Sequence, residues 1–113
     1  MPTTTQELQD YMQWCLDNDV NGNGQADEVG WSGAEKPSVW YARPTCFLMN
    51  SFTLTNQDGY YQKDDVIHCA MVEEGYRNGL KYLNGLMEAG LMDKNYPSND
   101  ENALKTLVAL EDG

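Results

Sequence analysis

One short stretch of this chain concentrates oxygen-bearing side chains at alternating positions. Residues 17–28 read Asp-Asn-Asp-Val-Asn-Gly-Asn-Gly-Gln-Ala-Asp-Glu. Calcium takes about six to eight oxygen ligands, and side chains at every second residue of an irregular loop can converge on one point. We therefore expect residues 17–28 to form a calcium-binding loop. The spacing predicts five side-chain ligands, namely Asp19, Asn21, Asn23, Asp27 and Glu28.

Two registers of this loop fit the residues. If Asp19 is the first ligand, Gly24 takes the sixth position, where the turn favours a residue without Cβ, and Gln25 supplies its backbone carbonyl. If Asp17 is the first ligand, the stretch follows the pattern D-x-[DN]-x-[DN]-G-x5-E. A simpler interpretation is a surface turn rich in Asn, Gly and Asp, which explains the glycines but not the alternating carboxylates and amides.

A paired calcium sensor is not expected. The segment after the loop, Val29 to Gly33, contains two glycines, and Pro37 follows soon after, so a good exit helix cannot start at once. The chain also has one such loop, whereas sensors usually pair two. Calcium is therefore expected to stabilise the loop structurally rather than to switch the protein between conformations.

The charge of the chain limits its partners. The 113 residues include 18 Asp and Glu against 7 Lys and Arg, which gives a net charge of −11. This field repels polyanions, so we expect no nucleic-acid partner and no anionic membrane surface. No apolar run approaches the roughly 20 residues needed to cross a bilayer, so direct membrane insertion of this segment is not expected. No signal peptide opens the chain, and any export signal would lie outside it.

The cysteines indicate neither a zinc site nor a disulfide framework. Cys15, Cys46 and Cys69 are odd in number and form no C-x-x-C pair. We expect them to be small buried residues with at most one bridge between them.

No catalytic residues are predicted. His68 and Cys69 are neighbours in an expected strand, where adjacent side chains point to opposite faces and cannot easily share a proton. The paired carboxylates at 64–65 and 73–74 fit a solvated turn and a helix start, where acids favour the helix dipole. We therefore do not expect an enzyme.

Three helices are predicted from apolar periodicity and capping residues. The first follows a capping box of Thr4 and Glu7, and the third follows one of Ser98 and Glu101. The second ends at Gly90, a typical C-cap. The apolar faces are Leu8, Tyr11, Met12, Cys15 and Leu16 for the first, Tyr76, Leu80, Leu83, Met87 and Leu91 for the second, and Leu104, Leu107 and Val108 for the third.

The middle of the chain combines a helical segment with a hairpin. Residues 38–52 are rich in large apolar side chains and are expected to be buried and helical, with an interruption near Pro44. A turn at 56–59 precedes two short β-rich runs at 60–61 and 66–69, which predict a small hairpin. The expected fold class is α+β, mostly helical with a short β-hairpin, in a single domain over residues 1–113.

Several stretches of the chain together carry a resemblance to a known family. The resemblance covers nearly the whole chain. In order, the matching stretches are Pro2-Thr3-Thr4, Asp19-Val-Asn-Gly-Asn-Gly-Gln-Ala-Asp-Glu28, Leu48-Met-Asn-Ser-Phe52, Tyr60-Tyr61, Asp64-Asp65-Val66 and Leu80-Lys-Tyr-Leu-Asn-Gly-Leu-Met-Glu-Ala-Gly-Leu-Met-Asp93. The loop and the helix end at residues 80–93 are specific as a pair. Together these stretches resemble the extracellular solute-binding proteins, family 1, of bacterial carbohydrate ABC transporters.

The resemblance implies a calcium site and a larger protein. It implies the ligands Asp19, Asn21, Asn23, Gln25, Asp27 and Glu28, with Ca²⁺ in a structural role. Val20 and Gln25 depart from the family, which often has Pro and Lys there, but neither change removes a side-chain ligand. Such receptors have two lobes with a type II periplasmic-binding-protein-like α/β fold. This chain is therefore expected to be an excised part of one lobe, unable by itself to clamp a sugar.

The resemblance also implies a function and its partners. The full-length protein would be an extracellular or periplasmic lipoprotein that captures a sugar or oligosaccharide and delivers it to ABC permease subunits. Sugars stack on aromatic rings and bind polar neighbours, which makes Trp31, Ser32, Trp40 and Tyr41 the candidate ligand contacts. Two alternatives remain open. One is a stand-alone calcium-stabilised interaction or adhesion module, and the other is part of a secreted carbohydrate-processing enzyme with catalytic carboxylates outside this chain.

Overall fold

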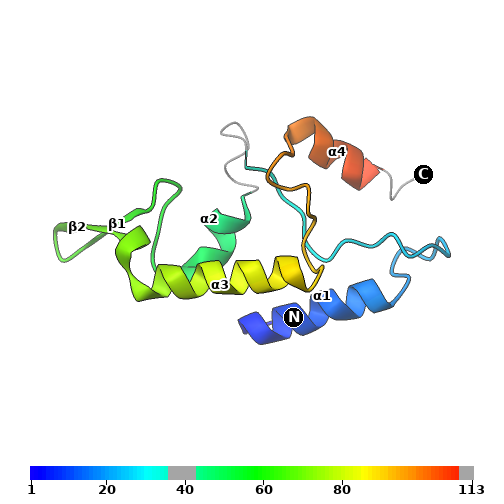
Figure 1. Ribbon diagram of the computed structural model, residues 1–113, viewed down its shortest axis with the longest axis horizontal. Coiled ribbons are helices and arrows are strands. Elements are labelled where there is room, and N and C mark those ends of the chain that lie inside the picture. The colour runs from blue at the N-terminus through cyan, green and yellow to red at the C-terminus, as the bar shows by residue number, and fades with distance from the viewer. Residues whose placement is uncertain (36–42, 110–113) are drawn as a thin grey trace.

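The chain forms an elongated arrangement of helices with a hairpin at one end. The computed structural model describes residues 1–35 and 43–109, and the molecule measures 53 × 29 × 23 Å (Figure 1). The hairpin and the loop after the first helix lie at opposite ends of the long axis. The predicted fold class, mostly helical with a short hairpin, is confirmed. The elements in order are α1 (Thr5–Asp17), α2 (Pro44–Leu48), η2 (Met49–Ser51), β1 (Tyr60–Lys63), β2 (Val66–Cys69), η3 (Ala70–Val72), α3 (Glu74–Glu88) and α4 (Glu101–Ala109).

The first predicted helix is confirmed as α1. The Thr4 hydroxyl accepts a hydrogen bond from the Glu7 amide at 3.1 Å, as an N-cap should. The Glu7 carboxylate reaches back to the amide of Thr3, at 2.7 Å, rather than to that of Thr4. Tyr11 was predicted on the buried face, but it is 54% exposed and stacks on Trp14 instead. It lies at the edge of the apolar stripe, where periodicity alone cannot separate buried from exposed positions.

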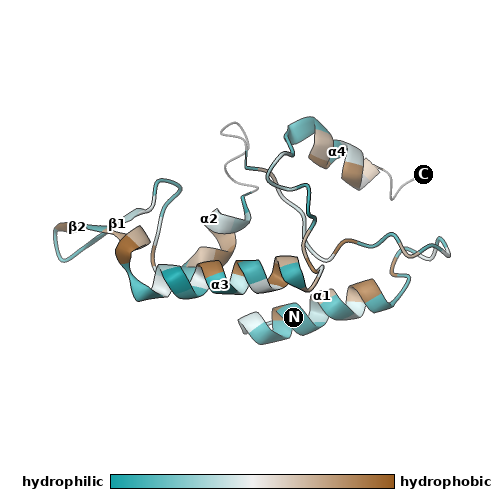
Figure 2. Ribbon diagram, viewed as in Figure 1, coloured by the Kyte–Doolittle hydropathy of each residue, from teal (hydrophilic) through white to brown (hydrophobic). Residues whose placement is uncertain are grey.

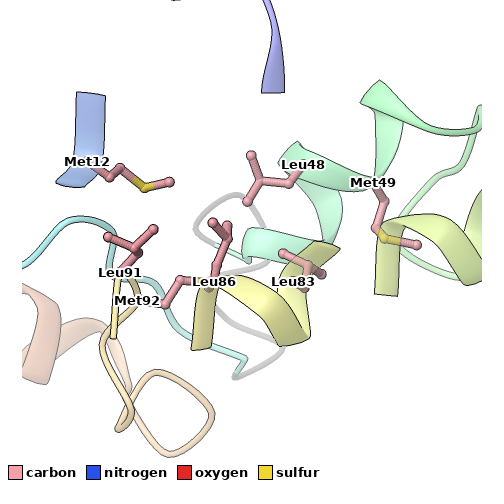
Figure 3. Packing of buried hydrophobic residues seen from close by; sticks show 7 residues of the cluster. All are labelled: Met12, Leu48, Met49, Leu83, Leu86, Leu91 and Met92. Carbon is pink, nitrogen blue, oxygen red and sulfur yellow. The ribbon is translucent and has the colours of Figure 1, made fainter. Parts of the chain in front are cut away.

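One apolar core joins α1, α2, η2, α3 and the turn after α3. Figure 3 shows side chains from these elements pointing toward one another. Leu86, which the predicted face omitted, is completely buried, whereas the predicted Leu80 is 47% exposed. The face of α3 is rotated because Gly79 lets η2 come close: a Cβ at Gly79 would lie 2.5 Å from the Met49 sulfur. The cluster comprises Met12, Leu48, Met49, Leu83, Leu86, Leu91 and Met92.

The predicted hairpin is confirmed as an antiparallel pair of β1 and β2. Its register pairs Tyr60 with Cys69 and Lys63 with Val66. The two residues between the strands have φ of 51° and 60°, the left-handed backbone of a tight hairpin turn. In Figure 2 the apolar residues of η3 lie between the hairpin and α3. A side-chain bond ties the hairpin to the start of α3, with the Tyr61 hydroxyl donating to the Glu73 carboxylate at 2.6 Å.

The predicted caps at the C-terminus of α3 and at the N-terminus of α4 have different outcomes. Gly90, with φ of 74°, follows α3, and the Leu91 amide donates to the Leu86 carbonyl at 2.9 Å, so the predicted glycine C-cap is confirmed. The predicted capping box before α4 is wrong. Asp100 caps this helix by accepting from the Ala103 amide at 2.9 Å, because Ser98 belongs to the preceding turn and donates to the Asn95 carbonyl. The Val108 side chain lies outside the described residues.

Several expectations of burial are corrected. Cys15, Cys46 and Cys69 are free and each is partly exposed, so the prediction that they are buried is wrong. Within the predicted helical segment at 38–52, residues 38–42 lie outside the described residues, and Phe47 on α2 is 65% exposed. With five and three residues, the helices α2 and η2 are too short to bury every large side chain. In the described ranges, no helix has both the length and the apolar character to cross a membrane.

Candidate functional site: the acidic loop and its exit strand

The acidic loop, residues 17–28, begins where α1 ends and is organised around one carboxylate. The Asp19 side chain accepts three backbone amides: Gly22 at 2.7 Å and Asn23 at 3.0 Å on one oxygen, and Gly24 at 2.7 Å on the other. Loop amides that surround a carboxylate in this way hold its oxygens in a fixed position. Asp19 is therefore the centre of the loop.

The remaining polar residues of the loop are joined by hydrogen bonds to one another. The Asn23 amide also donates to the Asn21 side chain at 2.9 Å, and the Asn23 oxygen accepts the Gln25 amide at 2.7 Å. The Asn23 side-chain nitrogen lies 3.2 Å from an Asp27 oxygen. Near the loop exit, a Glu28 oxygen accepts the Val20 amide at 2.9 Å. All six residues predicted as ligands thus lie in one hydrogen-bonded loop.

The position of Asp17, rather than the glycine backbone, distinguishes the two predicted registers. Gly22 and Gly24 both have positive φ, 75° and 77°, so each register has a glycine in its sixth place. Asp17, however, is the last residue of α1, and its carboxylate accepts the Gln13 side chain at 3.0 Å on the helix surface. The geometry therefore favours Asp19 as the first position of the loop.

The loop borders an open pocket of about 290 Å³ whose lining includes Asp19, Gln25 and Glu28. Among residues 1–35 and 43–109, no three His, Cys, Asp or Glu side chains gather as a metal-holding group. Ion pairs in the same ranges involve Glu35, Glu74 and Glu101, and none neutralises the loop. A mixed set of carboxylate, amide and carbonyl oxygens suits calcium, which binds oxygen donors of all three kinds.

Residues 29–33 leave the loop and are fastened to the turn after α3; we call this segment the exit strand, although only Trp31 forms a β-bridge. Trp31 forms a parallel bridge with Met92, and its carbonyl accepts the Asp93 amide at 2.8 Å. The Ser32 hydroxyl donates to the Asp93 carboxylate at 2.8 Å across 61 residues of sequence. The Asn99 side chain donates to the same carboxylate oxygen at 2.8 Å and also to the Gly33 carbonyl at 3.2 Å.

Asp93 is the centre of this second cluster and was not predicted as a site residue. Burial opposes its ionisation, but hydrogen bonds from the Asn95 amide, Ser32 and Asn99 outweigh burial and hold the pKa of the carboxyl below its usual 3.8. Asp93 closes the helix-end motif that carries the family resemblance, but nothing local in the sequence indicates its contact with Ser32.

An apolar pocket of about 580 Å³ lies beside the same strand. Trp31 lines it with Leu8, Phe47 and Leu48, and Thr4 and Ser51 add hydroxyl groups. The rings of Trp31 and Phe47 have centroids 5.3 Å apart and are tilted by 36°. Of the four predicted ligand contacts, Trp31 lies in this pocket and Ser32 is hydrogen-bonded to Asp93. Trp40 and Tyr41 lie outside the described residues.

Comparisons with known proteins show what the chain as a whole is similar to. No family model matches the chain. Over 105 residues, the chain is 29% identical to the fructooligosaccharide ABC transporter substrate-binding protein FusA of Streptococcus pneumoniae, covering 91% of the chain and 19% of FusA. The structure of FusA in complex with kestose aligns with a TM-score of 0.79 at 29% identity, over 91% of this chain and 21% of that one. This chain resembles one segment of an ABC-transporter substrate-binding protein.

Two further structures agree with this assignment. A solute-binding protein from Bifidobacterium longum infantis, associated with an ABC transporter and binding human milk oligosaccharides (HMO), aligns with a TM-score of 0.80 at 27% identity, over 94% of this chain and 23% of that one. An EF-hand mutant of FusA in complex with fructo-nystose aligns with a TM-score of 0.78 at 27% identity, over 91% and 21% of the two chains. The predicted resemblance to carbohydrate solute-binding proteins is confirmed. The chain spans about one fifth of the length of the relatives it matches.

Proposed function

We propose that this chain is a segment of a solute-binding protein that captures an oligosaccharide for an ABC importer. The observation that carries this proposal is the match to FusA in both sequence and structure over 91% of the chain. Because the relatives are about five times longer, the segment would act as part of one lobe. The complete protein would be an extracellular or periplasmic lipoprotein, and its partners would be a sugar ligand and ABC permease subunits, without catalysis of its own.

We further propose that the acidic loop binds one Ca²⁺ in a structural role. The side chains that would hold it are Asp19, Asn21, Asn23, Asp27 and Glu28, with the backbone carbonyl of Gln25. Two observations support this. The loop amides orient the Asp19 carboxylate and the asparagine oxygens, and a relative of similar structure is an EF-hand mutant. When bound, the ion would neutralise carboxylates that no lysine or arginine pairs in the described ranges.

Trp31 is the candidate sugar contact in this segment. It is half-buried, and its ring meets the exposed ring of Phe47 in the apolar pocket. Sugars present apolar faces to aromatic rings and hydroxyls to neighbouring polar groups, and Thr4 and Ser51, which line the pocket, could bind those hydroxyls. Ser32 would assist by keeping the backbone of Trp31 in place. Trp40 and Tyr41 stay in the proposal as sequence-based candidates.

Sugar binding by the product of the complete reading frame tests the proposed function. Calorimetric titration with fructo-oligosaccharides and human milk oligosaccharides should give saturable binding for one of these classes. The 113-residue chain alone should bind none of them tightly. Tight, selective binding by the isolated chain would refute the one-lobe interpretation, and no binding by the complete product to any oligosaccharide would refute the receptor function.

A further inference from the structure

The exit strand of the acidic loop packs tightly against the turn after α3. Gly30 lies so close to the turn after α3 that a Cβ there would be 2.5 Å from the Leu91 carbonyl oxygen and 3.1 Å from the Met12 Cβ. The next residue, Trp31, bonds through its carbonyl to the Asp93 amide. Only Val29 separates this fixed backbone from Glu28, the last predicted ligand.

One carboxylate, that of Asp93, holds the strand in this place, through Ser32 directly and through Asn99 indirectly. Asp93 accepts Ser32 and Asn99 on one oxygen and the Asn95 amide on the other, at 2.8 Å each. Asn99 extends the cluster to the Gly33 carbonyl. All three groups donate, so the carboxylate is the acceptor that joins the exit strand to the turn after α3 and to the segment before α4.

We infer that Asp93 is a positioning residue for the calcium loop. It fixes the backbone just beyond Glu28, so the ligands at the end of the loop are in place before an ion arrives. Ordering a residue costs conformational entropy. When the cluster is broken, the exit strand gains freedom that calcium binding must then remove, and the affinity falls. This inference rests on the proposed calcium site.

Calcium binding should in turn stabilise the ordered exit strand. A ligand that binds more tightly when the strand is ordered must, by linkage, stabilise the ordered strand by the same factor. Calcium would therefore protect the Trp31 and Asp93 amides from exchange, although neither residue is a predicted ligand. Through Trp31, the ion would also steady one wall of the apolar pocket.

The test substitutes Asp93→Asn in the 113-residue chain. In the variant, an NH2 group replaces one of the two carboxylate oxygens. This donor then faces groups that themselves donate. We expect the calcium Kd from titration calorimetry to rise about tenfold, because the variant loses at least one charge-assisted hydrogen bond and only part of that loss is transmitted to the loop. Amide hydrogen exchange at residues 26–33 of the metal-free chain should become faster as well.

Matched variants separate this role from charge and from folding. Asp58→Asn makes the same change of charge in an exposed turn and should leave the calcium Kd within about twofold, as a distant screened charge would. Ser32→Ala removes one of the hydrogen bonds without changing charge and should raise the Kd about threefold, which carries the test if Asp93→Asn fails to fold.

The outcomes distinguish this inference from the proposed site. If Asp93→Asn and Ser32→Ala leave both the calcium Kd and the exchange at residues 26–33 unchanged, Asp93 has no positioning role, although the calcium site stands. If the unaltered chain binds no calcium, the proposed site itself is refuted, and the inference with it.

Discussion

The Asp19 carboxylate and the Gly24 amide are joined by a hydrogen bond of 2.7 Å across the acidic loop. Gly24 can turn its amide toward Asp19 because its backbone is left-handed, with φ of 77°. The two residues fix the turn of the loop around the Asp19 carboxylate, which also accepts the Gly22 and Asn23 amides. The first prediction about metal binding depends on this contact.

Asp19→Ala should abolish calcium binding, because it removes a ligand and the acceptor of three loop amides. Each lost bond to a charged group is worth roughly 1.5–3 kcal/mol, so the affinity should fall by well over tenfold. The matched control is Asp17→Ala, which removes an acid whose partner is Gln13 on α1. Calorimetry should show nearly unchanged binding for the control. Equal losses in both variants would favour the register that starts at Asp17.

Gly24→Ala and Gly85→Ala should change stability in opposite directions. A Cβ at either glycine would meet nothing within 4 Å, so the two sites differ in backbone conformation and not in space. In the left-handed loop, alanine costs roughly 1–2 kcal/mol, whereas inside α3 it gains roughly 1 kcal/mol over glycine. Chemical denaturation measures both. Destabilisation by both variants would contradict the conformational explanation.

Leu86→Ala should destabilise the chain by roughly 2–5 kcal/mol, since Leu86 is completely buried in the core. Leu80→Ala, on the exposed side of the same helix, removes the same atoms and should cost less than about 1 kcal/mol. Urea denaturation of the two variants gives the comparison. Similar losses would place the core face of α3 where periodicity alone puts it.

Tyr61→Phe should reduce the loss of folding stability that occurs as the pH falls. The Tyr61 hydroxyl, helped by that of Thr53, lowers the pKa of the Glu73 carboxyl from its usual 4.5. A lowered folded-state pKa adds stability that is complete above pH 4.5 and is lost as the pH falls through the folded value. Phenylalanine keeps the ring beside His68 but removes the donor. Unfolding midpoints between neutral and acid pH should therefore fall less steeply in the variant, and Tyr60→Phe should match the unaltered chain.

Local sequence patterns predicted the helices, the hairpin and the loop because their causes lie within a few residues. Thr4 caps the helix whose amides it meets, and Gly90 ends one at positive φ. The misassigned residues depend on distant contacts. Leu80 and Tyr11 sit at the edges of apolar stripes, and their burial is decided by which neighbour approaches, as with the Met49 sulfur over Gly79.

The candidate site divides in the same way. The ligand pattern of the loop is local and could be read from spacing alone. The Asp93 cluster joins residues 61 positions apart, so an isolated Asp93 gives no sign of its partner Ser32. The exposed Phe47 was likewise expected to be buried, and its contact with Trp31 depends on how α2 packs beside the exit strand.

Thermal unfolding with calcium and after chelation tests the central claim most directly. A ligand that binds only the native state adds about 2.7 kcal/mol at 100 times its Kd, which in a domain of this size raises the Tm by on the order of ten degrees. The account predicts such a rise for the unaltered chain and its loss when Asp27 and Glu28 are both changed to Ala. An unchanged Tm at millimolar calcium would show that the loop is only a surface turn and would contradict the account.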